Sequence, residues 1–306
     1  MRVLLIVNAS ASSVTERARV VIHKALAADH EVTMAETSRR GHATKLAQGA
    51  AADGVEVVVV LGGDGTLNEA ANGLAGTRAA LGVLPGGSTN VFARTIGMTN
   101  DPIEATGELL GALARGSIRQ VGLGSVNGRY FLFNVGLGFD AAVVAQVERW
   151  GSLKRYAGQA LFLASAIDTW FRHYDRGRPR FFLAATSADG REHRVEQGYF
   201  GIVLHTNPYT FFGNRPLDVV PGAGLDSRLS VVAFRRLNLL TLLPVAAAAL
   251  RGKGVRGRGI SDIGDVVAAS VKPFGPLPYQ VDGDYLGEAD HLDLRFEADA
   301  LRLVVP

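Results

Sequence analysis

The sequence predicts an α/β fold: an N-terminal three-layer α/β domain, followed by a C-terminal, mostly antiparallel β-sandwich domain with inserted helices. In the first third of the chain, strand-like apolar runs alternate with helix-like segments, which is typical of a parallel sheet covered by helices. After about residue 117, strand-like segments follow one another and are separated by hairpin turns such as Asn127-Gly128. A length of 306 residues is sufficient for two such domains.

Hydrophobic periodicity predicts the elements of the first domain in turn. The first helix is expected to begin after Ser13, because Ser13-Val14-Thr15-Glu16 has the form of a capping box. The apolar run 55–61 leads directly into glycines and reads as a buried strand. The expected strands are 2–7, 31–36, 55–61 and 81–84, and the expected helices are 14–26, 42–52, 88–96 and 102–115.

The second domain is predicted as a series of strands with three helical interruptions. The expected strands are 118–126, 129–135, 180–187, 191–195, 199–206, 229–234, 266–271 and 279–281, and the helices are 139–150, 155–172 and 239–250. The tail segments 292–296 and 301–305 are further strands that fit either sheet. We therefore expect one domain over residues 1–120, joined by the tail 298–306, and a second over 121–297.

Composition narrows the class of protein. Hydrophobic residues make up 47% of the chain and charged residues 20%, as in folded globular proteins. With no cysteine, the chain has no disulfide, thiolate nucleophile or cysteine-based zinc site. The most apolar stretch, 239–250, contains Pro244 and is shorter than the roughly 20 residues a membrane span needs. The start of the chain lacks the layout of a signal peptide, so we expect a cytoplasmic protein.

The segment Leu61-Gly62-Gly63-Asp64-Gly65-Thr66 follows directly on the strand predicted at 55–61. Glycines take backbone conformations that are closed to other residues and let a ligand approach the main chain. Successive amides at the start of a helix bind anions such as phosphate. The Asp64 carboxylate beside them suits Mg²⁺ bound to phosphate oxygens. The segment predicts a phosphate-binding loop, with a plain turn as the alternative.

The longer run GGDGTLNE, from Gly62 to Glu69, lacks the lysine of a Walker A loop and the spacing of a dinucleotide-binding loop. It resembles the nucleotide loop of the lipid kinase superfamily that includes diacylglycerol kinases and sphingosine kinases. NAD kinases and phosphofructokinases share the shorter core GGDG, and Asn68-Glu69 favours the lipid kinase branch. The resemblance implies that ATP is bound by Gly62, Gly63, Asp64, Gly65, Thr66, Asn68 and Glu69.

A second segment, from Pro85 to Arg94, resembles the Pro-Gly-Thr/Ser-x-Asn-Asp-Phe-Ala-Arg segment that lines the nucleotide site of these kinases. It departs from that pattern at Val91, where the family commonly has Asp. The resemblance implies that Ser88, Thr89 and Asn90 contribute to nucleotide binding. Helix capping by the hydroxyl groups is the alternative.

The third segment is Gln280-Val281-Asp282-Gly283-Asp284. It resembles the Asp-Gly-Glu segment of bacterial diacylglycerol kinases, whose Asp is the general base, with Asp284 in place of the Glu. The resemblance implies that Asp282 and Asp64 are the catalytic residues. Asp282 would accept the proton of a lipid hydroxyl as its oxygen attacks the γ-phosphate, and such a base typically contributes a rate gain of about 10²–10⁴-fold.

Two weaker resemblances complete the predicted site. Asn8, Ser10 and Ser12 lie where the family has an Asn-Pro-x-Ser-Gly loop, and Thr37 falls where it has a nucleotide-contacting Thr. These residues follow strand ends, where ligands of α/β sheets bind, so we expect Asn8, Thr37, Asp64 and Ser88 to converge. Asp226 lies in a segment that resembles a structural Mg²⁺ loop of some bacterial members. The predicted metal ligands are therefore Asp64, through phosphate or water, and Asp226.

Together these resemblances imply an ATP- and Mg²⁺-dependent lipid kinase that phosphorylates diacylglycerol to phosphatidic acid. ATP is expected in a cleft between the domains, with the lipid acceptor entering from the second domain. A kinase for a sphingoid base or another lipid alcohol is the nearest alternative. An alternative from another class is a non-catalytic nucleotide- or lipid-binding sensor, which Val91 and Asp284 would suit.

The predicted partners follow from charge and from the lipid substrate. The net charge is +3, and a basic cluster follows the apolar segment 239–250. We expect peripheral contact with the anionic inner face of the membrane. The cluster has no interleaved aromatic residues, which argues against nucleic-acid binding, and a homodimer remains open. The cluster comprises Arg251, Lys253, Arg256 and Arg258.

Overall fold

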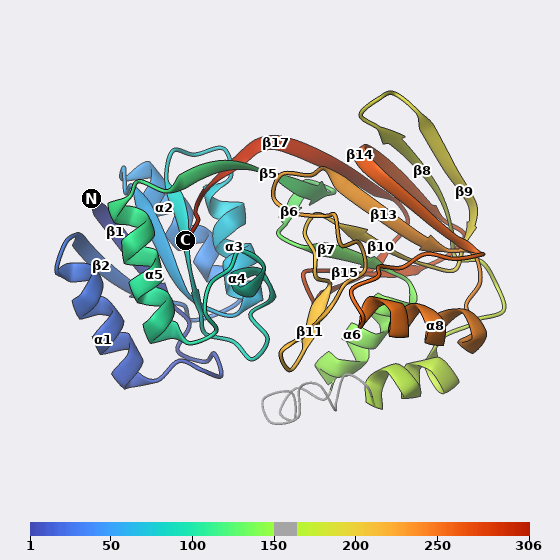
Figure 1. Cartoon of the computed structure of the whole chain (residues 1–306), viewed down its shortest axis with the longest axis horizontal. Coiled ribbons are helices and arrows are strands. Elements are labelled where there is room, and N and C mark those ends of the chain that lie inside the picture. The colour runs from blue at the N-terminus through green and yellow to red at the C-terminus, as the bar shows by residue number, and fades with distance from the viewer. Residues whose placement is uncertain (150–163) are drawn as a thin grey trace. The chain divides into compact units, whose positions relative to one another are not determined.

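The computed structural model describes residues 1–149 and 164–306 (Figure 1). The chain divides into two compact units, unit 1 being Met1–Leu123 with Ala298–Pro306, and unit 2 being Gly124–Glu297. The chain passes from one unit to the other within strand β5 (Ile118–Val126) and within strand β17 (Leu292–Val304). In the part of the chain that is described, no helix is long and apolar enough to cross a membrane.

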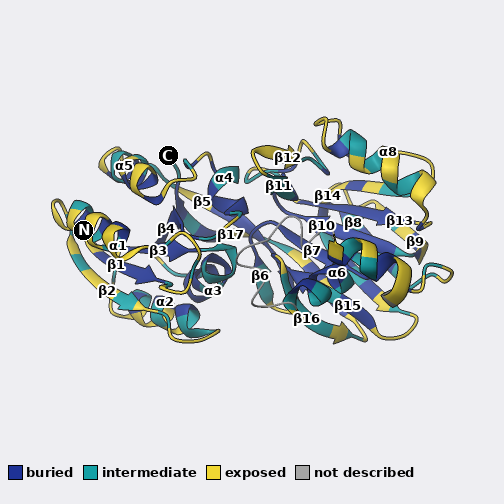
Figure 2. Cartoon of the chain, turned by 90° about the horizontal axis from the view of Figure 1, so that it is seen from below, coloured by how far each residue is buried: buried dark blue, intermediate teal, exposed yellow. Residues whose placement is uncertain are grey.

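Unit 1 is a parallel sheet with helices on both faces. The strands lie in the order β17-β4-β3-β1-β2 and all run parallel. Helices α1 and α5 pack together on one side of the sheet, and α2 and α3 pack together on the other (Figure 2). The elements are β1 (Arg2–Val7), α1 (Glu16–Ala27), β2 (Glu31–Glu36), α2 (His42–Ala52), β3 (Val57–Gly62), α3 (Asp64–Leu74), β4 (Ala80–Pro85), α4 (Val91–Thr95) and α5 (Pro102–Ala114).

The order of the strands explains their composition. Strand β3 lies between β1 and β4 and is covered on both faces, so all six of its residues are buried. Such a strand is a continuous apolar run rather than an alternating one. Strand β2 lies at the edge, and all but two of its residues are exposed, which fits its alternating, polar sequence.

Unit 2 is built on an antiparallel sheet in the order β16-β15-β7-β10-β13-β14, with β14 also paired to β8 and β17. A separate hairpin is formed by β11 (Thr210–Phe212) and β12 (Arg215–Leu217). The remaining elements are β6 (Arg129–Phe131), β7 (Asn134–Leu137), α6 (Phe139–Arg149), the π-helix η1 (Thr169–His173), β8 (Phe181–Ser187), β9 (Glu192–Gly198), β10 (Phe200–Leu204), β13 (Leu229–Phe234), α8 (Leu239–Ala249), β14 (Ile260–Pro273), β15 (Leu277–Val281) and β16 (Asp284–Ala289).

The central strands of unit 2 separate two hydrophobic cores. Because successive side chains of a strand point to opposite faces, Val231 of β13 enters one core and Val232 enters the other. The first core is made by strands, including β8, β14 and β17. The second includes residues of η1 and α8, which cover the opposite face. The predicted sandwich with inserted helices is therefore confirmed.

Several predicted elements differ from the structure. The strand expected at 129–135 is divided into β6 and β7, and the helix expected at 88–96 is limited to α4. The two tail segments are one strand, β17, and the predictions omitted β11, β12 and β16. Most of the helix expected at 155–172 lies outside the described residues.

Candidate functional site

The carboxyl ends of β1, β2, β3 and β4 lie at one edge of the sheet in unit 1, because these strands are parallel. Asn8 follows β1, and its side-chain amide donates a hydrogen bond to the hydroxyl of Thr66 at 2.9 Å. The amide of Thr37, after β2, donates to the carbonyl of Val7 at 2.9 Å. The structure thus places Asn8, Thr37 and the glycine loop at the same edge of the sheet, as expected for residues that follow parallel strands.

Two pairs of glycines hold the loops after β3 and β4 together. A Cβ atom on Gly86 would lie 2.8 Å from the nitrogen of Gly62, and one on Gly87 would lie 2.9 Å from the Cα of Gly63. Main chain therefore packs directly on main chain, and side chains at these positions would separate the loops. None of Gly62, Gly63 and Gly65 has a positive φ, so these glycines serve the close approach of main chain rather than an unusual backbone conformation.

The loop that follows β1 is attached to the same place. The amide and hydroxyl of Ser13 donate to the carbonyls of Gly86 and Gly87, at 2.9 and 3.1 Å. Ser10 and Ser12 are exposed beside them, Ser88 is exposed on the loop after β4, and Thr89 is half-buried. The loops that carry these residues meet next to Gly63, at the start of α3, whose first amides lack partners within the helix and attract anions. The edge therefore fits the phosphates of a nucleotide.

Asp64 occupies the first turn of α3, and its carboxylate reaches the start of α4. Its two oxygens accept hydrogen bonds from the amides of Val91 at 2.9 Å and Phe92 at 3.0 Å. Burial raises the pKa of Asp64, and the two amide donors oppose that rise. Each oxygen keeps a further lone pair, so the carboxylate can also accept from water. Asp64 thus fixes the loop after β4 as well as lying beside the helix start.

Three more of the predicted nucleotide-binding residues have structural partners. The Glu69 carboxylate accepts from the amides of Gly41 at 2.7 Å and Ala43 at 3.1 Å, and so caps α2, which has no side-chain cap of its own. Asn68 is buried and accepts from the side chain of Asn72. Asn90 has a φ of 48°, and its side chain both accepts from and donates to the main chain of Gly87.

In unit 2, Asp282 forms the turn between β15 and β16 together with Gly283, both with positive φ. The Asp282 side chain is only 5% exposed. Its Oδ2 accepts from the amide of Leu132 at 2.7 Å, and its Oδ1 accepts from the amides of Phe133 and Asn134 at 2.9 and 3.0 Å. Three amide donors stabilise a negatively charged carboxylate. The break between β6 and β7 lies at these amides, because they point toward Asp282 rather than toward a strand.

A buried polar network lies behind this turn. The Gln280 side chain donates to Oδ1 of Asn134 at 2.7 Å and to Oδ2 of Asp140 at 2.8 Å, and it accepts from the amide of Gly283 at 2.7 Å. The Tyr209 hydroxyl donates to the other oxygen of Asp140. The network therefore joins the first turn of α6 to the turn that carries Asp282.

Electrostatics in this network are set by burial. Asp140 is 7% exposed. Burial raises the pKa of Asp140, while the hydrogen bonds from Tyr209 and Gln280 lower it. Burial and the charge of Asp140 raise the pKa of Tyr209 well above its usual value. Gly136 is required here, because a Cβ atom at that position would overlap the Asp140 carboxylate.

Sequence reasoning missed Asp140, Tyr209 and the role of Gln280. The run 134–140, NVGLGFD, carries a signal that could have identified Asp140: an acid after a glycine-containing strand, at the start of a helix. Tyr209 carries no such signal, because its partner lies 69 positions away.

Asp284 lies near Arg129, with 3.7 Å between its carboxylate and the guanidinium.

The predicted metal ligand Asp226 lies in the loop between β12 and β13. In residues 1–149 and 164–306, no group of three or more His, Asp or Glu side chains is arranged to hold a metal ion. Asp226 as a ligand therefore stays a prediction. A cation at Asp64 would take its other oxygen ligands from phosphate and water, which is how Mg²⁺ usually binds in kinases.

Residues 2–126 match the family model described as the diacylglycerol kinase catalytic domain. The diacylglycerol kinase of Bacillus subtilis (strain 168) is 30% identical over 243 residues, which cover 78% of this chain and 75% of that protein. The protein of Pseudomonas aeruginosa (strain UCBPP-PA14) named Probable lipid kinase YegS-like is 30% identical, covering 74% of this chain and 79% of its own.

A solved structure has the same fold. The crystal structure of a diacylglycerol kinase from Bacillus anthracis str. Sterne aligns with a TM-score of 0.69 at 19% identity. The alignment covers 100% of this chain and 97% of that chain. At this level of identity the likeness concerns the fold alone.

Proposed function

Because the chain belongs to the diacylglycerol kinase family and is a lipid kinase that uses ATP, we propose that it transfers the γ-phosphate of ATP to the hydroxyl of diacylglycerol, giving phosphatidic acid. The observation that carries this proposal is the pairing of features within one chain. Unit 1 offers amides at a helix start, and unit 2 offers a buried carboxylate that accepts hydrogen bonds from three amides.

We assign ATP binding to the sheet edge of unit 1. The start of α3, from Gly63 to Thr66, binds the phosphates through main-chain amides, while Asn8 holds Thr66 in place. Asp64 would hold Mg²⁺ through phosphate or water, and the cation would supply charge neutralisation. Glu69 and Asn90 act by fixing α2 and the loop after β4, rather than by touching the nucleotide.

We assign activation of the acceptor to Asp282. Its Oδ2 lies 2.7 Å from the amide of Leu132, and we assign to this oxygen the acceptance of the proton of the lipid hydroxyl. Phosphoryl transfer passes through a loose transition state, in which the positioning of groups matters more than the strength of the base, so a rigidly held carboxylate is adequate. The proton moves from the hydroxyl to Oδ2 as the oxygen binds the γ-phosphorus and the bond to ADP breaks.

The acceptor is tested with a panel of lipid alcohols. Purified protein is incubated with γ-labelled ATP, Mg²⁺ and mixed micelles containing diacylglycerol, monoacylglycerol or a sphingoid base. We expect labelled phosphatidic acid with the highest kcat/KM. Faster labelling of another lipid alcohol would show that this alcohol, and not diacylglycerol, is the acceptor. The panel is included because the name of the YegS-like relative specifies no acceptor. ATP binding without turnover on every lipid would favour a sensor.

A further inference from the structure

Helix α8 of unit 2 is unusual for a surface helix, because it has no polar face. Its sequence, LLTLLPVAAAA, contains no charged residue, and only Ala249 is buried. Leu242 and Val245 pack partly against the core of unit 2. Leu240 is 89% exposed and Leu243 is 64% exposed, three residues apart and therefore on one face. A helix that is apolar all round is normally buried, so this face lacks a partner among the residues that the structure describes.

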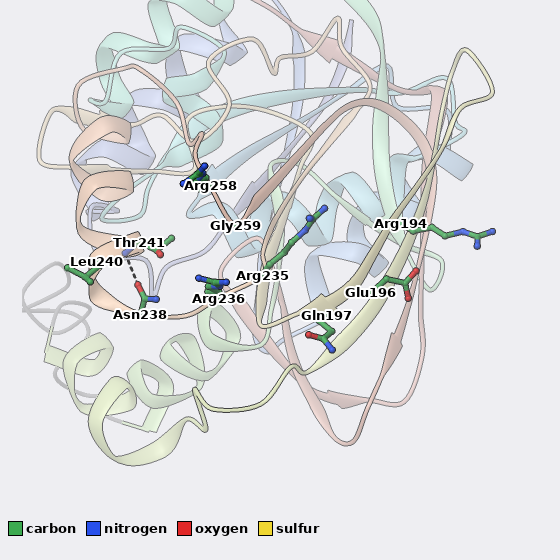
Figure 3. Close-up of a pocket in the computed structure, with 10 residues that line it drawn as sticks. All are labelled: Arg194, Glu196, Gln197, Arg235, Arg236, Asn238, Leu240, Thr241, Arg258 and Gly259. Carbon is green, nitrogen blue, oxygen red and sulfur yellow. Dashed lines mark hydrogen bonds between the residues drawn. The ribbon is translucent and has the colours of Figure 1, made fainter.

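A pocket of about 890 Å³ opens beside the first turn of α8 (Figure 3). Four arginines and one carboxylate, Glu196, line it, together with Asn238 and Leu240. Arg235 and Arg236 lie on the segment between β13 and α8, and Arg258 lies in the loop before β14. The fourth, Arg194, forms an ion pair with Glu192 at 3.3 Å.

The arginines nearest the helix are available to a ligand. Arg235 donates from Nε to Ser261 at 3.0 Å, which leaves the rest of its guanidinium. Among the described residues, Arg236 and Arg258 form no ion pair, and both are exposed. Guanidinium groups bind phosphate through paired hydrogen bonds, so three such groups fit a phosphate ester.

We propose that α8 and this arginine pocket form a docking surface for an anionic phospholipid bilayer. Leu240 and Leu243 enter the boundary between headgroups and acyl chains, while the pocket holds the phosphate of an anionic headgroup. The charge argues for this occupant, since a bilayer presents anions around an apolar interior. In a symmetric dimer the same patch faces itself, and its arginines would repel one another. The surface complements the proposed function, because it would bring the enzyme to its lipid substrate.

The test is sedimentation with vesicles of phosphatidylcholine alone and of phosphatidylcholine with phosphatidylglycerol, without nucleotide. We expect binding to the anionic vesicles that weakens as salt rises. Arg236→Gln with Arg258→Gln should weaken it about 30-fold, since a basic side chain at an anionic surface contributes about five-fold. Leu240→Ser with Leu243→Ser should weaken it at least tenfold, given the usual contribution of a buried leucine.

Matched controls lie on unit 1. Arg17→Gln with Arg115→Gln removes the same charge, and Val20→Ser with Ile103→Ser removes exposed apolar side chains; neither pair should change vesicle binding.

Three results would overturn the proposal. The first is that the wild type binds no vesicles, and the second is that it binds both vesicle types equally. The third is that either the arginine variant or the leucine variant binds as tightly as the wild type does. If the leucine variant instead dissociated a dimer and still bound vesicles, α8 would be an interface between copies of the chain. Lipid phosphorylation in detergent micelles separates the two proposals. A chain that bound vesicles and phosphorylated no lipid would contradict the proposed function alone.

Discussion

Replacing Tyr209 by Phe isolates the network behind Asp282. The change removes only the hydroxyl that donates to Asp140, so the buried carboxylate keeps the hydrogen bond from Gln280 at 2.8 Å. A hydrogen bond to a buried charged group contributes about 1.5–3 kcal/mol. For a unit of this size, that corresponds to a fall in Tm of roughly 4–10 °C. Urea unfolding followed by the fluorescence of the buried Trp170 reports on unit 2 directly.

The loss should depend on pH. Burial raises the pKa of Asp140 above its unfolded value of 3.8, so the stability this group contributes is present below that value and is lost as pH rises through the folded pKa. The Tyr209 hydroxyl offsets that loss by stabilising the charged form. Tyr209→Phe should therefore cost about 2–3 kcal/mol at pH 8 and about 1 kcal/mol at pH 4.

Tyr279→Phe is the matched control. Tyr279 lies next to Gln280, and its hydroxyl has no hydrogen-bond partner among residues 1–149 and 164–306. This variant should unfold as the wild type does at both pH values. A Tyr209→Phe protein of wild-type stability, or one that loses more at pH 4 than at pH 8, would refute the reasoning.

Three further changes test other parts of the structure. Glu69→Ala removes the cap of α2 and should cost about 1 kcal/mol, with faster amide exchange at Gly41 and Ala43; unchanged exchange would contradict the capping role. Gly86→Ala places a Cβ 2.8 Å from the nitrogen of Gly62 and should raise the Kd for ATP at least tenfold, whereas Gly107→Ala, which has open space, should not. Burial lowers the pKa of His205 to about 4, so the stability that this neutral histidine contributes is present above pH 6.5 and is lost as pH falls through 4. In His205→Gln, about 3 kcal/mol of the acid-induced loss of stability should disappear, as measured by urea unfolding at several pH values. A variant with the pH dependence of the wild type would count against this reasoning.

The fold was accessible from sequence because its signals are local. The continuous apolar run that forms β3 and the hairpin at Asn127-Gly128 each depend on neighbouring residues, and both predict the observed elements. The interruption between β6 and β7 depends instead on the Asp282 carboxylate, about 150 positions away in the chain. Strands β11 and β12 contain three residues each, too few to show a periodic pattern.

The motifs of the candidate site stand out in the sequence, whereas the contacts that support them do not. The glycine loop and Asp282 stand at turns after strands, which the sequence marks. That Glu69 caps α2, and that Gly86 packs on Gly62, follows only when distant segments are brought together. Asp140 and Tyr209 are a further example: both are buried, and each is the hydrogen-bond partner that allows the other's polar group to be buried.

The most direct test of the central claim is the turnover of Asp282→Asn. Its matched control is Asp265→Asn, because Asp265 also has a positive φ, of 55°, and is exposed away from the turn. We predict that Asp282→Asn lowers kcat for lipid phosphorylation at least 100-fold and changes the Kd for ATP less than threefold, as expected for loss of a general base. Asp265→Asn should retain both values. An Asp282→Asn protein that keeps more than a tenth of the wild-type kcat would contradict the account.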